Sequence, residues 1–352
     1  MSALNPLSSR DRRDPIDARA ILERLLRGEG LSRAQAAALA REILTGEVPA
    51  PVTAAILAAL RAKGESAAEI AGFVDVFAAA ATPIELDGPL LDTCGTGGDG
   101  AGTFNVSTVA AIVAAALGAR VAKHGNGAIS SRSGSSDLLA ALGAKVDLEP
   151  ASVARSVRTT GLGFLYAPRF HPAFRAVADV RRALGVRTIF NLLGPLLNPA
   201  PITHQLLGVM APELVLPIAA VLREKGRRRA LVVHGDGLDE IATSGPTTAV
   251  ELRGAALDRM TLTPEALGVP RADKALLRGG SAEENARATR AVLGGASGPL
   301  SDAVAASAGV AVFVAGLVET PREGVARARE AMGDGRAARK LEAFIDVTRS
   351  EP

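Results

Sequence analysis

Apolar residues recur at helical spacing through the first part of the chain. They do so in four segments, each closed by glycine or proline: residues 17–27, 32–45, 52–62 and 67–80. This spacing is typical of amphipathic helices, because positions three and four apart share one face. Ser32 with Gln35 resembles a capping box at the start of the second segment. We therefore predict a small all-helical domain over residues 15–82, preceded by a disordered polar arm over residues 1–14.

From residue 83 onward the pattern changes to short apolar runs that alternate with helical segments. The predicted strands are residues 90–92, 120–123, 162–166, 204–208, 230–234 and 249–252. The predicted helices are residues 107–117, 135–142, 151–160, 213–224, 282–293, 301–318 and 322–348, the last interrupted near residues 333–335. Strands alternating with helices indicate an α/β layer architecture. We expect a large α/β domain over residues 83–352.

Composition excludes several classes of protein. The 352 residues carry a formal charge of only +3, from 40 basic and 37 acidic residues, and nine Phe and one Tyr are the only aromatic residues. This balance disfavours nucleic acid as a partner. The longest apolar run, residues 303–318, is short for a membrane span and is better explained as a buried helix. We predict a cytoplasmic protein that does not enter a membrane.

The single cysteine, Cys94, excludes an intramolecular disulfide framework and fits a reducing compartment. A thiol nucleophile is one interpretation of Cys94. Its position beside glycines favours the other interpretation, a small residue that simply fits there.

Residues 92–108 form the stretch with the most candidate chemistry, DTCGTGGDGAGTFNVST. The glycines lie between a short apolar run and a helix that begins near Ser107 and Thr108. Backbone N–H groups at a helix N-terminus lack helical partners and attract anions. Glycines alone would equally fit a tight turn, but Asp99 and Asn105 add polar groups and favour a phosphate site. The spacing matches neither the P-loop nor the dinucleotide-binding fingerprint.

A second loop, residues 123–137, reads KHGNGAISSRSGSSD and also follows a predicted strand. Lys123 supplies a point charge suited to phosphate, and Gly125 and Gly127 permit close backbone approach. The serines offer hydroxyl donors. Two such loops after two strands predict one highly charged ligand at the carboxyl ends of the strands, where open α/β sheets bind ligands.

Two further stretches carry polar side chains that could be functional. Residues 234–247 place the vicinal carboxylates Asp239 and Glu240 after a strand, a pattern that suits Mg²⁺ held together with substrate phosphates. A surface turn is the alternative. Residues 166–199 carry His171 and a set of arginines, for which a structural loop histidine and a solvated helix face are the alternatives. The run KGRRR at residues 225–229 is predicted to be a solvated cap ahead of a strand.

Taken together, these motifs resemble the anthranilate phosphoribosyltransferase family. They are GTGGDG with TFNVST, KHGN, FHPAF with VRRALGVRTIFNLLGPLLNP, and HGDGLDE, and the resemblance runs from about residue 17 to 347. It implies a small helical domain, completed by a helical segment within about residues 168–199, and a large α/β domain with a central, mostly parallel sheet flanked by helices. It also implies a homodimer formed through the helical domain. The implied reaction joins anthranilate to 5-phosphoribosyl 1-diphosphate in tryptophan biosynthesis.

The resemblance also implies roles for individual residues. The diphosphate end of the sugar substrate would be bound by Gly95, Gly98, Asp99, Thr103, Asn105, Val106, Ser107 and Thr108. The phosphoribosyl part would be bound by Lys123, His124, Gly125, Asn126, Gly127, Ala128, Ile129, Ser130, Ser131 and Ser135. Anthranilate would contact Gly95, Asn126, His171 and Arg181. Two Mg²⁺ ions are implied, one at Ser107 and a second at Asp239 and Glu240, and the residues closest to catalysis would be Lys123, Asn126 and Arg181.

Two positions depart from the family pattern: Gly127 stands where an arginine is common, and Ala140 where a glutamate is common. A pyrimidine nucleoside phosphorylase of the same fold is one alternative, and a non-catalytic nucleic-acid-binding relative is another. The Asp239 and Glu240 pair and Arg181 argue against the first, because they suit a metal-bound diphosphate and an acidic acceptor. The weak net charge argues against the second.

Overall fold

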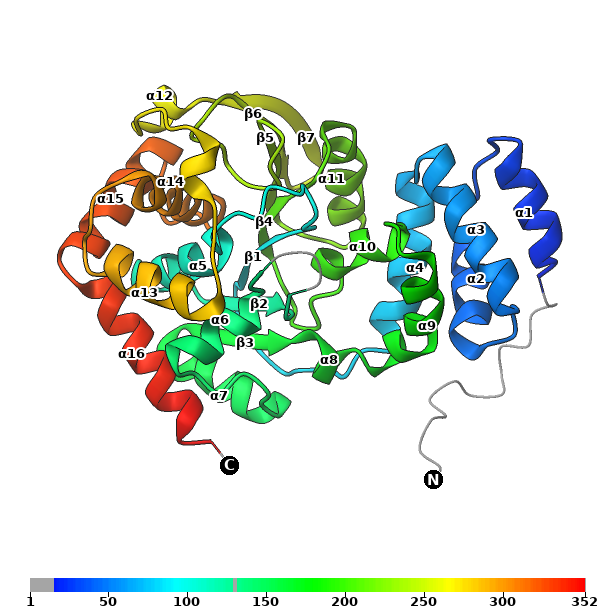
Figure 1. Ribbon diagram of the computed structural model, residues 1–352, viewed down its shortest axis with the longest axis horizontal. Coiled ribbons are helices and arrows are strands. Elements are labelled where there is room, and N and C mark those ends of the chain that lie inside the picture. The colour runs from blue at the N-terminus through cyan, green and yellow to red at the C-terminus, as the bar shows by residue number, and fades with distance from the viewer. Residues whose placement is uncertain (1–15, 129–131, 352) are drawn as a thin grey trace. The chain divides into compact units, whose positions relative to one another are not determined.

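A computed structural model describes residues 16–128 and 132–351 of the chain. The arm predicted for residues 1–14 lies outside the described residues. The chain forms two compact units from interleaved segments (Figure 1). The helical unit contains the residues up to Ala81 together with His171–Leu193, and the α/β unit contains Thr82–Phe170 together with the residues from Gly194 onward.

The helical unit contains the four helices predicted from the first part of the chain, and the prediction is confirmed. Its helices are α1 (Ala18–Leu26), α2 (Arg33–Thr45), α3 (Ala50–Lys63), α4 (Ala67–Ala79), α9 (Arg175–Leu184) and α10 (Ile189–Leu193), with the short 3₁₀ turn η1 (Pro172–Phe174). Ser32 and Ser66 both form capping boxes, which satisfy N–H groups at the starts of α2 and α4. Phe77 packs against the rings of Phe174 and Phe190, at centroid distances of 5.0 and 5.3 Å, so aromatic contacts join α4 to the later segment.

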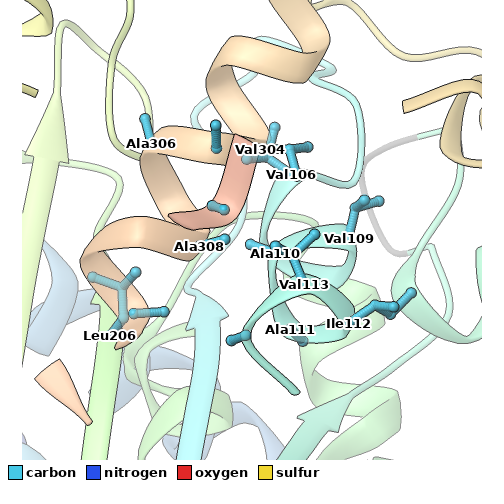
Figure 2. Packing of buried hydrophobic residues seen from close by; sticks show 14 of the residues in the cluster. Val106, Val109, Ala110, Ala111, Ile112, Val113, Leu206, Val304, Ala306 and Ala308 are labelled. Atoms are coloured by element: carbon cyan, nitrogen blue, oxygen red, sulfur yellow. The ribbon is translucent and has the colours of Figure 1, made fainter. Parts of the chain in front are cut away.

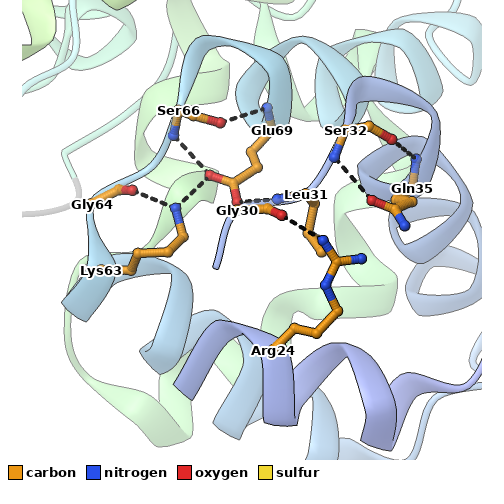
Figure 3. Close-up of polar contacts among 9 residues, drawn as sticks. All are labelled: Arg24, Gly30, Leu31, Ser32, Gln35, Lys63, Gly64, Ser66 and Glu69. Carbon is orange, nitrogen blue, oxygen red and sulfur yellow. Dashed lines mark hydrogen bonds and ion pairs between the residues drawn. The ribbon is translucent and has the colours of Figure 1, made fainter. Parts of the chain in front are cut away.

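A buried carboxylate ties the loop before α2 to the start of α4 (Figure 3). The side chain of Glu69 is fully buried, and its oxygens accept hydrogen bonds from Leu31 N at 2.9 Å and Ser66 N at 2.8 Å. Lys63 Nζ lies 2.9 Å from Glu69 Oε2. Burial by itself raises the pKa of Glu69, but the bonds from Ser66, Lys63 and Leu31 outweigh it, so the pKa lies below its usual value.

The α/β unit is built on one seven-stranded sheet in the order β3-β2-β1-β4-β5-β6-β7. The strands are β1 (Leu91–Gly95), β2 (Val121–Gly125), β3 (Leu162–Tyr166), β4 (His204–Gly208), β5 (Arg229–Gly235), β6 (Thr247–Arg253) and β7 (Ala256–Leu262). The strand pairs from β3 to β5 are parallel, and β6 and β7 add antiparallel pairs. The predicted mostly parallel sheet is confirmed.

Helices cover both faces of this sheet (Figure 1). They are α5 (Val106–Ala116), α6 (Ser135–Leu142), α7 (Pro150–Thr160), α8 (Ala167–Phe170), α11 (Val215–Glu224), α12 (Pro264–Leu267), α13 (Ala282–Leu293), α14 (Pro299–Val314), α15 (Pro321–Gly333) and α16 (Arg336–Arg349). Successive strand residues face opposite sides, so Val121 and Phe164 belong to one core, and Ala122 and Leu165 to another. Figure 2 shows part of the first core, in which side chains of α5 and α14 face each other and Leu206 of β4 lies beside α14.

Two sequence-based expectations for this unit were wrong. The helix predicted for residues 301–318 ends at Val314, because Gly316 adopts a left-handed φ of 76° and turns the chain. Strand β7 was not predicted, because most of its residues are exposed and it shows no apolar alternation. No helix among the described residues is long and apolar enough to cross a membrane.

We expect Glu69→Ala to lower the free energy of unfolding by about 2–4 kcal/mol. It leaves the buried N–H of Leu31 and the partly buried N–H of Ser66 without their acceptor, and it leaves Lys63 only its bond to Gly64 O. Since the pKa of Glu69 is depressed by folding, its contribution is present above the unfolded pKa of about 4.3 and lost as the pH falls below it. Chemical denaturation followed by circular dichroism between pH 3 and pH 7 measures both effects.

Asp75→Asn is the matched control on α4. Asp75 pairs with Arg33, and both side chains are more than two-fifths exposed, so this variant should change stability by less than about 0.5 kcal/mol. Equal losses for the two variants would contradict the structural role assigned to Glu69.

Candidate active site

Three loops of the α/β unit gather at the carboxyl ends of its strands. Residues 96–105 follow β1, residues 126–134 follow β2, and residues 236–246 follow β5. These three strands are parallel, so their carboxyl ends lie at one edge of the sheet. This is the edge at which open α/β sheets bind ligands.

The first and third loops contact each other directly, although they are far apart in sequence. Gly97 N donates a hydrogen bond to Asp239 Oδ2 at 2.6 Å, and Ser107 N donates to Glu240 Oε1 at 3.2 Å. Asp239 N in turn donates to Asp99 Oδ2 at 3.4 Å. The carboxylate pair therefore lies against the glycine loop and the N-terminus of α5, and the alternative of an isolated surface turn is wrong.

The close approach of Asp239 requires glycine on two neighbouring strands. A Cβ atom on Gly95 at the end of β1 would overlap Asp239 Oδ2, and one on Gly208 at the end of β4 would overlap the Asp239 backbone. Gly95 therefore determines where the carboxylate can sit. Any side chain at Gly95 or Gly208 would push the third loop away from the first.

The carboxylates are held where negative charge is unfavourable. Burial, followed by the nearby charge of Asp99, raises the pKa of Asp239 to about 7. Burial and then the charge of Asp239 raise the pKa of Glu240 to about 8, although Lys123 acts in the opposite direction. A site that concentrates acidic groups in this way favours a bound cation.

Lys123 brings positive charge to the same place. Its side chain is only 4% exposed, and Nζ donates hydrogen bonds to the backbone oxygen of Thr93 and, at 3.4 Å, to Ser107 Oγ. Thr93 Oγ1 donates to Ser107 O at 3.0 Å, which fixes the first turn of α5 against β1. The lysine charge, the helix N-terminus and the carboxylates thus meet around Ser107.

Polar side chains at the start of α6 hold the described ends of the second loop. Asp137 Oδ2 accepts hydrogen bonds from Ala128 N and Gly134 N, both at 2.8 Å. Asn126 O accepts from Ser135 Oγ at 3.1 Å, and Asn126 Oδ1 accepts from Gly127 N at 2.8 Å. These bonds hold residues 126–128 against the start of α6. The predicted site residues Ile129, Ser130 and Ser131 lie outside the described residues.

Asn105 connects the first loop to the second. It is the N-cap residue of α5, and its Nδ2 donates to Ser133 O at 3.0 Å. Its Oδ1 accepts from Asn285 Nδ2 of α13 at 2.9 Å. Sequence reasoning missed Asn285, because a single asparagine inside a helical pattern carries no local functional signal.

The other predicted residues of this site are either buried or half-buried. Val106 and Thr108 are buried on α5, and His124 is buried with Nδ1 3.1 Å from Gly194 O. Gly98 and Thr103 are half-buried. They can contribute backbone groups to a ligand.

Arg181 and His171, which were predicted to contact anthranilate, belong to the helical unit. Arg181 is half-buried, with its guanidinium carbon 5.8 and 5.7 Å from the ring centroids of Phe174 and Phe190. Burial lowers its pKa, and none of the described carboxylates forms an ion pair with it. Its neighbour Arg182 is exposed and pairs with Asp179, as expected for a solvated face.

Two predictions about other residues have clear outcomes. The solvated cap predicted at residues 225–229 is wrong for Arg227, which is buried and donates to Gln205 Oε1 at 3.1 Å and to Ile202 O at 2.7 Å. Cys94 is buried, and burial followed by the charge of Asp92 raises its pKa well above the usual value. Such a thiol is a poor nucleophile, so the structural interpretation of Cys94 holds.

The oxygens of Ser107, Asp239 and Glu240 fit magnesium whose remaining ligands come from water and substrate phosphates. The described residues contain no group of three or more His, Cys, Asp or Glu side chains arranged to hold a metal. Mg²⁺ commonly binds through one or two carboxylates and fills its remaining positions with water and phosphate oxygens. Asp239, Glu240 and the Ser107 hydroxyl meet this requirement.

The helical unit and the α/β unit match the two domains of one transferase family. Residues 19–81 match the helical bundle domain of the glycosyl transferase family, and residues 87–338 match its a/b domain.

Individual relatives narrow this class. The anthranilate phosphoribosyltransferase of Anaeromyxobacter sp. (strain K) is 51% identical over 328 residues, which is 93% of this chain and 97% of that protein. The crystal structure of the Thermus thermophilus enzyme is 46% identical with a TM-score of 0.88, covering 95% of this chain and 100% of that one. The Saccharomyces cerevisiae enzyme in complex with PRPP and Mg is 29% identical with a TM-score of 0.86, covering 95% and 98%. This chain belongs to the anthranilate phosphoribosyltransferase family.

We expect Asp239→Asn to stabilise the metal-free protein by about 1–2 kcal/mol at pH 8, because it removes a buried charge from a cluster of like charges. An acid whose pKa is raised by folding costs stability as the pH rises from its unfolded value toward about 7. The gain should therefore be small at pH 5 and full at pH 8, as measured by thermal unfolding in the presence of a chelator.

Asp236→Asn provides the control, because Asp236 lies in the same loop and is exposed. Its effect on stability at pH 8 should be smaller than that of Asp239→Asn. A pH-independent effect of Asp239→Asn would show that the ionised carboxylate of Asp239 does not destabilise the protein.

Proposed function

We propose that this protein transfers the phosphoribosyl group of 5-phosphoribosyl 1-diphosphate to the amine of anthranilate. The products are N-(5-phosphoribosyl)anthranilate and diphosphate, and the reaction is a step of tryptophan biosynthesis. The main observation in support is that Asp239 and Glu240 accept hydrogen bonds from the glycine loop and the N-terminus of α5. Lys123 contacts the same N-terminus through Ser107 Oγ. The family membership gives this site its substrates.

The donor is held by the two glycine-containing loops. The N–H groups at the start of α5 and the charge of Lys123 favour the oxygens of the diphosphate. Gly95, Gly98, Asp99, Thr103 and the residues from Asn105 to Thr108 are the proposed contacts for the diphosphate end. The loop from Lys123 to Ser131, with Ser135, is proposed to hold the phosphoribosyl part.

Two magnesium ions are proposed to accompany the donor. Ser107 is the proposed ligand of one, and Asp239 and Glu240 are the proposed ligands of the other. When bound, Mg²⁺ would supply positive charge beside the phosphate oxygens. The raised pKa values of Asp239 and Glu240 support this assignment, because a cation relieves the repulsion between their charges.

The chemical step needs positioning and charge stabilisation more than proton transfer. The bond between C1 of the ribose and the diphosphate oxygen breaks with its electron pair leaving on diphosphate, and the anthranilate nitrogen forms the new bond to C1. The amine is nucleophilic while neutral, and its extra proton is lost to solvent after attack. Lys123 and the α5 N–H groups stabilise the charge that grows on diphosphate, and positioning the amine supplies the rest.

Arg181 is proposed to bind the anthranilate carboxylate, with Gly95, Asn126 and His171 as further contacts. A guanidinium matches a carboxylate through two parallel hydrogen bonds. Arg181 supports this role because two phenylalanine rings flank it and no described carboxylate pairs with it.

A homodimer formed through the helical unit is also proposed. The family membership supports this proposal, and Leu26 and Val186 of that unit are large apolar side chains exposed by 66% and 60%. Sedimentation velocity tests this, and a monomer at micromolar concentration would contradict it.

The cytoplasm remains the proposed location, in keeping with the buried reduced thiol of Cys94.

Anthranilate fluorescence tests the proposed function directly. The purified protein with 5-phosphoribosyl 1-diphosphate and Mg²⁺ should consume anthranilate, seen as loss of its fluorescence, and mass spectrometry should identify the phosphoribosylated product. A chelator should stop the reaction. Persistent fluorescence over a wide range of protein and metal concentrations would rule the function out.

We expect Arg181→Ala to raise the KM for anthranilate by on the order of tenfold or more, because it removes a charge-assisted hydrogen-bond pair. The KM for the donor should change less than about twofold. Steady-state kinetics with each substrate varied in turn separates the two.

Arg182→Ala is the matched control, since it removes the same charge from the neighbouring, exposed position of α9. Its kinetic constants should equal those of the wild type. An equal rise in both KM values for Arg181→Ala would indicate that Arg181 only supports the fold.

A further inference from the structure

Residues 277–285 form hydrogen bonds with the first glycine loop, although they are far from it in sequence. Phe104 N donates to Leu277 O at 2.7 Å, and Gly279 N donates to Gly102 O at 2.8 Å. Thr103 and Arg278 form an isolated antiparallel bridge between these two bonds. The end of the glycine loop is therefore paired like a short strand just before α5 begins.

The pairing is close. A Cβ atom added to Gly279 would lie 3.0 Å from Thr103 O, which is tighter than most real contacts.

Asn285 extends these contacts to the side chains. It is only 4% exposed, and its Oδ1 accepts a hydrogen bond from Gly280 N at 2.8 Å. Its Nδ2 donates to Asn105 Oδ1 at 2.9 Å, and Asn105 Nδ2 donates to Ser133 O at 3.0 Å. A continuous chain of hydrogen bonds thus runs from α13 through the first loop to the second.

The polarity of this chain is fixed at both ends. Gly280 N can only donate, so it must face the oxygen of Asn285. Ser133 O can only accept, so it must face the amide nitrogen of Asn105. The remaining contact then joins Asn285 Nδ2 to Asn105 Oδ1, and neither amide can flip without placing two donors or two acceptors together.

We infer that Asn285 is a positioning residue for the donor, which acts by fixing the side chain of Asn105 and holding the two phosphate loops in one arrangement. The inference rests on the proposed function and deepens it, because it adds α13 to the parts that build the donor site. Loops already held in the binding geometry lose less entropy when the ligand arrives. A second link, Arg132 to Glu284 at 3.9 Å, is exposed and contributes little.

Asn285→Ala tests the inference through donor binding. We expect the Kd of 5-phosphoribosyl 1-diphosphate in Mg²⁺, measured by calorimetry, to rise on the order of tenfold. The KM for anthranilate should change less than about twofold. Thr289→Val is the matched control, because Thr289 is buried one turn further along α13 and its hydroxyl has no hydrogen-bond partner among the described residues.

Asn285→Asp adds a readout that a structural role would not move. Its ionised carboxylate would face Asn105 Oδ1 and repel it, whereas the protonated acid can donate to that oxygen. The loss of donor affinity relative to wild type should therefore shrink as the pH falls from 8 to 6. In the double variant with Asn105→Ala, Asn285→Ala should add little to the loss that Asn105→Ala causes alone.

Several results would overturn the inference. They are wild-type donor affinity in Asn285→Ala, an equal loss in Thr289→Val, additive losses in the double variant, and a pH-independent loss in Asn285→Asp. Because donor binding is measured without anthranilate, a protein that binds the donor but leaves anthranilate unconsumed would contradict the proposed function alone. Failure of the wild-type protein to bind the donor would overturn both.

Discussion

The contact between Asp239 and the glycine loop is the constraint on which the rest of the site depends. Asp239 Oδ2 accepts from Gly97 N at 2.6 Å, and the approach is possible only because β1 and β4 end in Gly95 and Gly208. Folding in this way brings acidic groups together in a buried place, which raises their pKa values and costs stability. The cost is understandable if a cation and a charged substrate complete the site.

Positively charged groups also lie close to Ser107. Lys123 and the N-terminus of α5 are both fixed by bonds to β1 or to Ser107, so their charges are in place before a ligand arrives. A diphosphate carrying Mg²⁺ matches both halves of this arrangement. The site therefore combines electrostatic preorganisation with backbone donors, and it needs no strong general base.

Sequence reasoning succeeded where a local pattern determined the structure. The amphipathic helices, most strands of the α/β unit and the loops after β1 and β2 all followed from residues close together in the chain. It failed where long-range packing decided the outcome. Strand β7 is defined by pairing with β6, Arg227 is buried by contacts to Gln205 and Ile202, and Asn285 gains its role only through Asn105.

The most direct test of the account is calorimetric titration of the wild-type protein with 5-phosphoribosyl 1-diphosphate, with and without Mg²⁺. If the acidic pair and the phosphate loops form one site, one donor molecule should bind to each protein chain in the presence of Mg²⁺. Its affinity should be at least on the order of tenfold weaker when a chelator removes Mg²⁺. Equal affinity under the two conditions would show that Asp239 and Glu240 do not take part in binding the donor, and it would contradict the account.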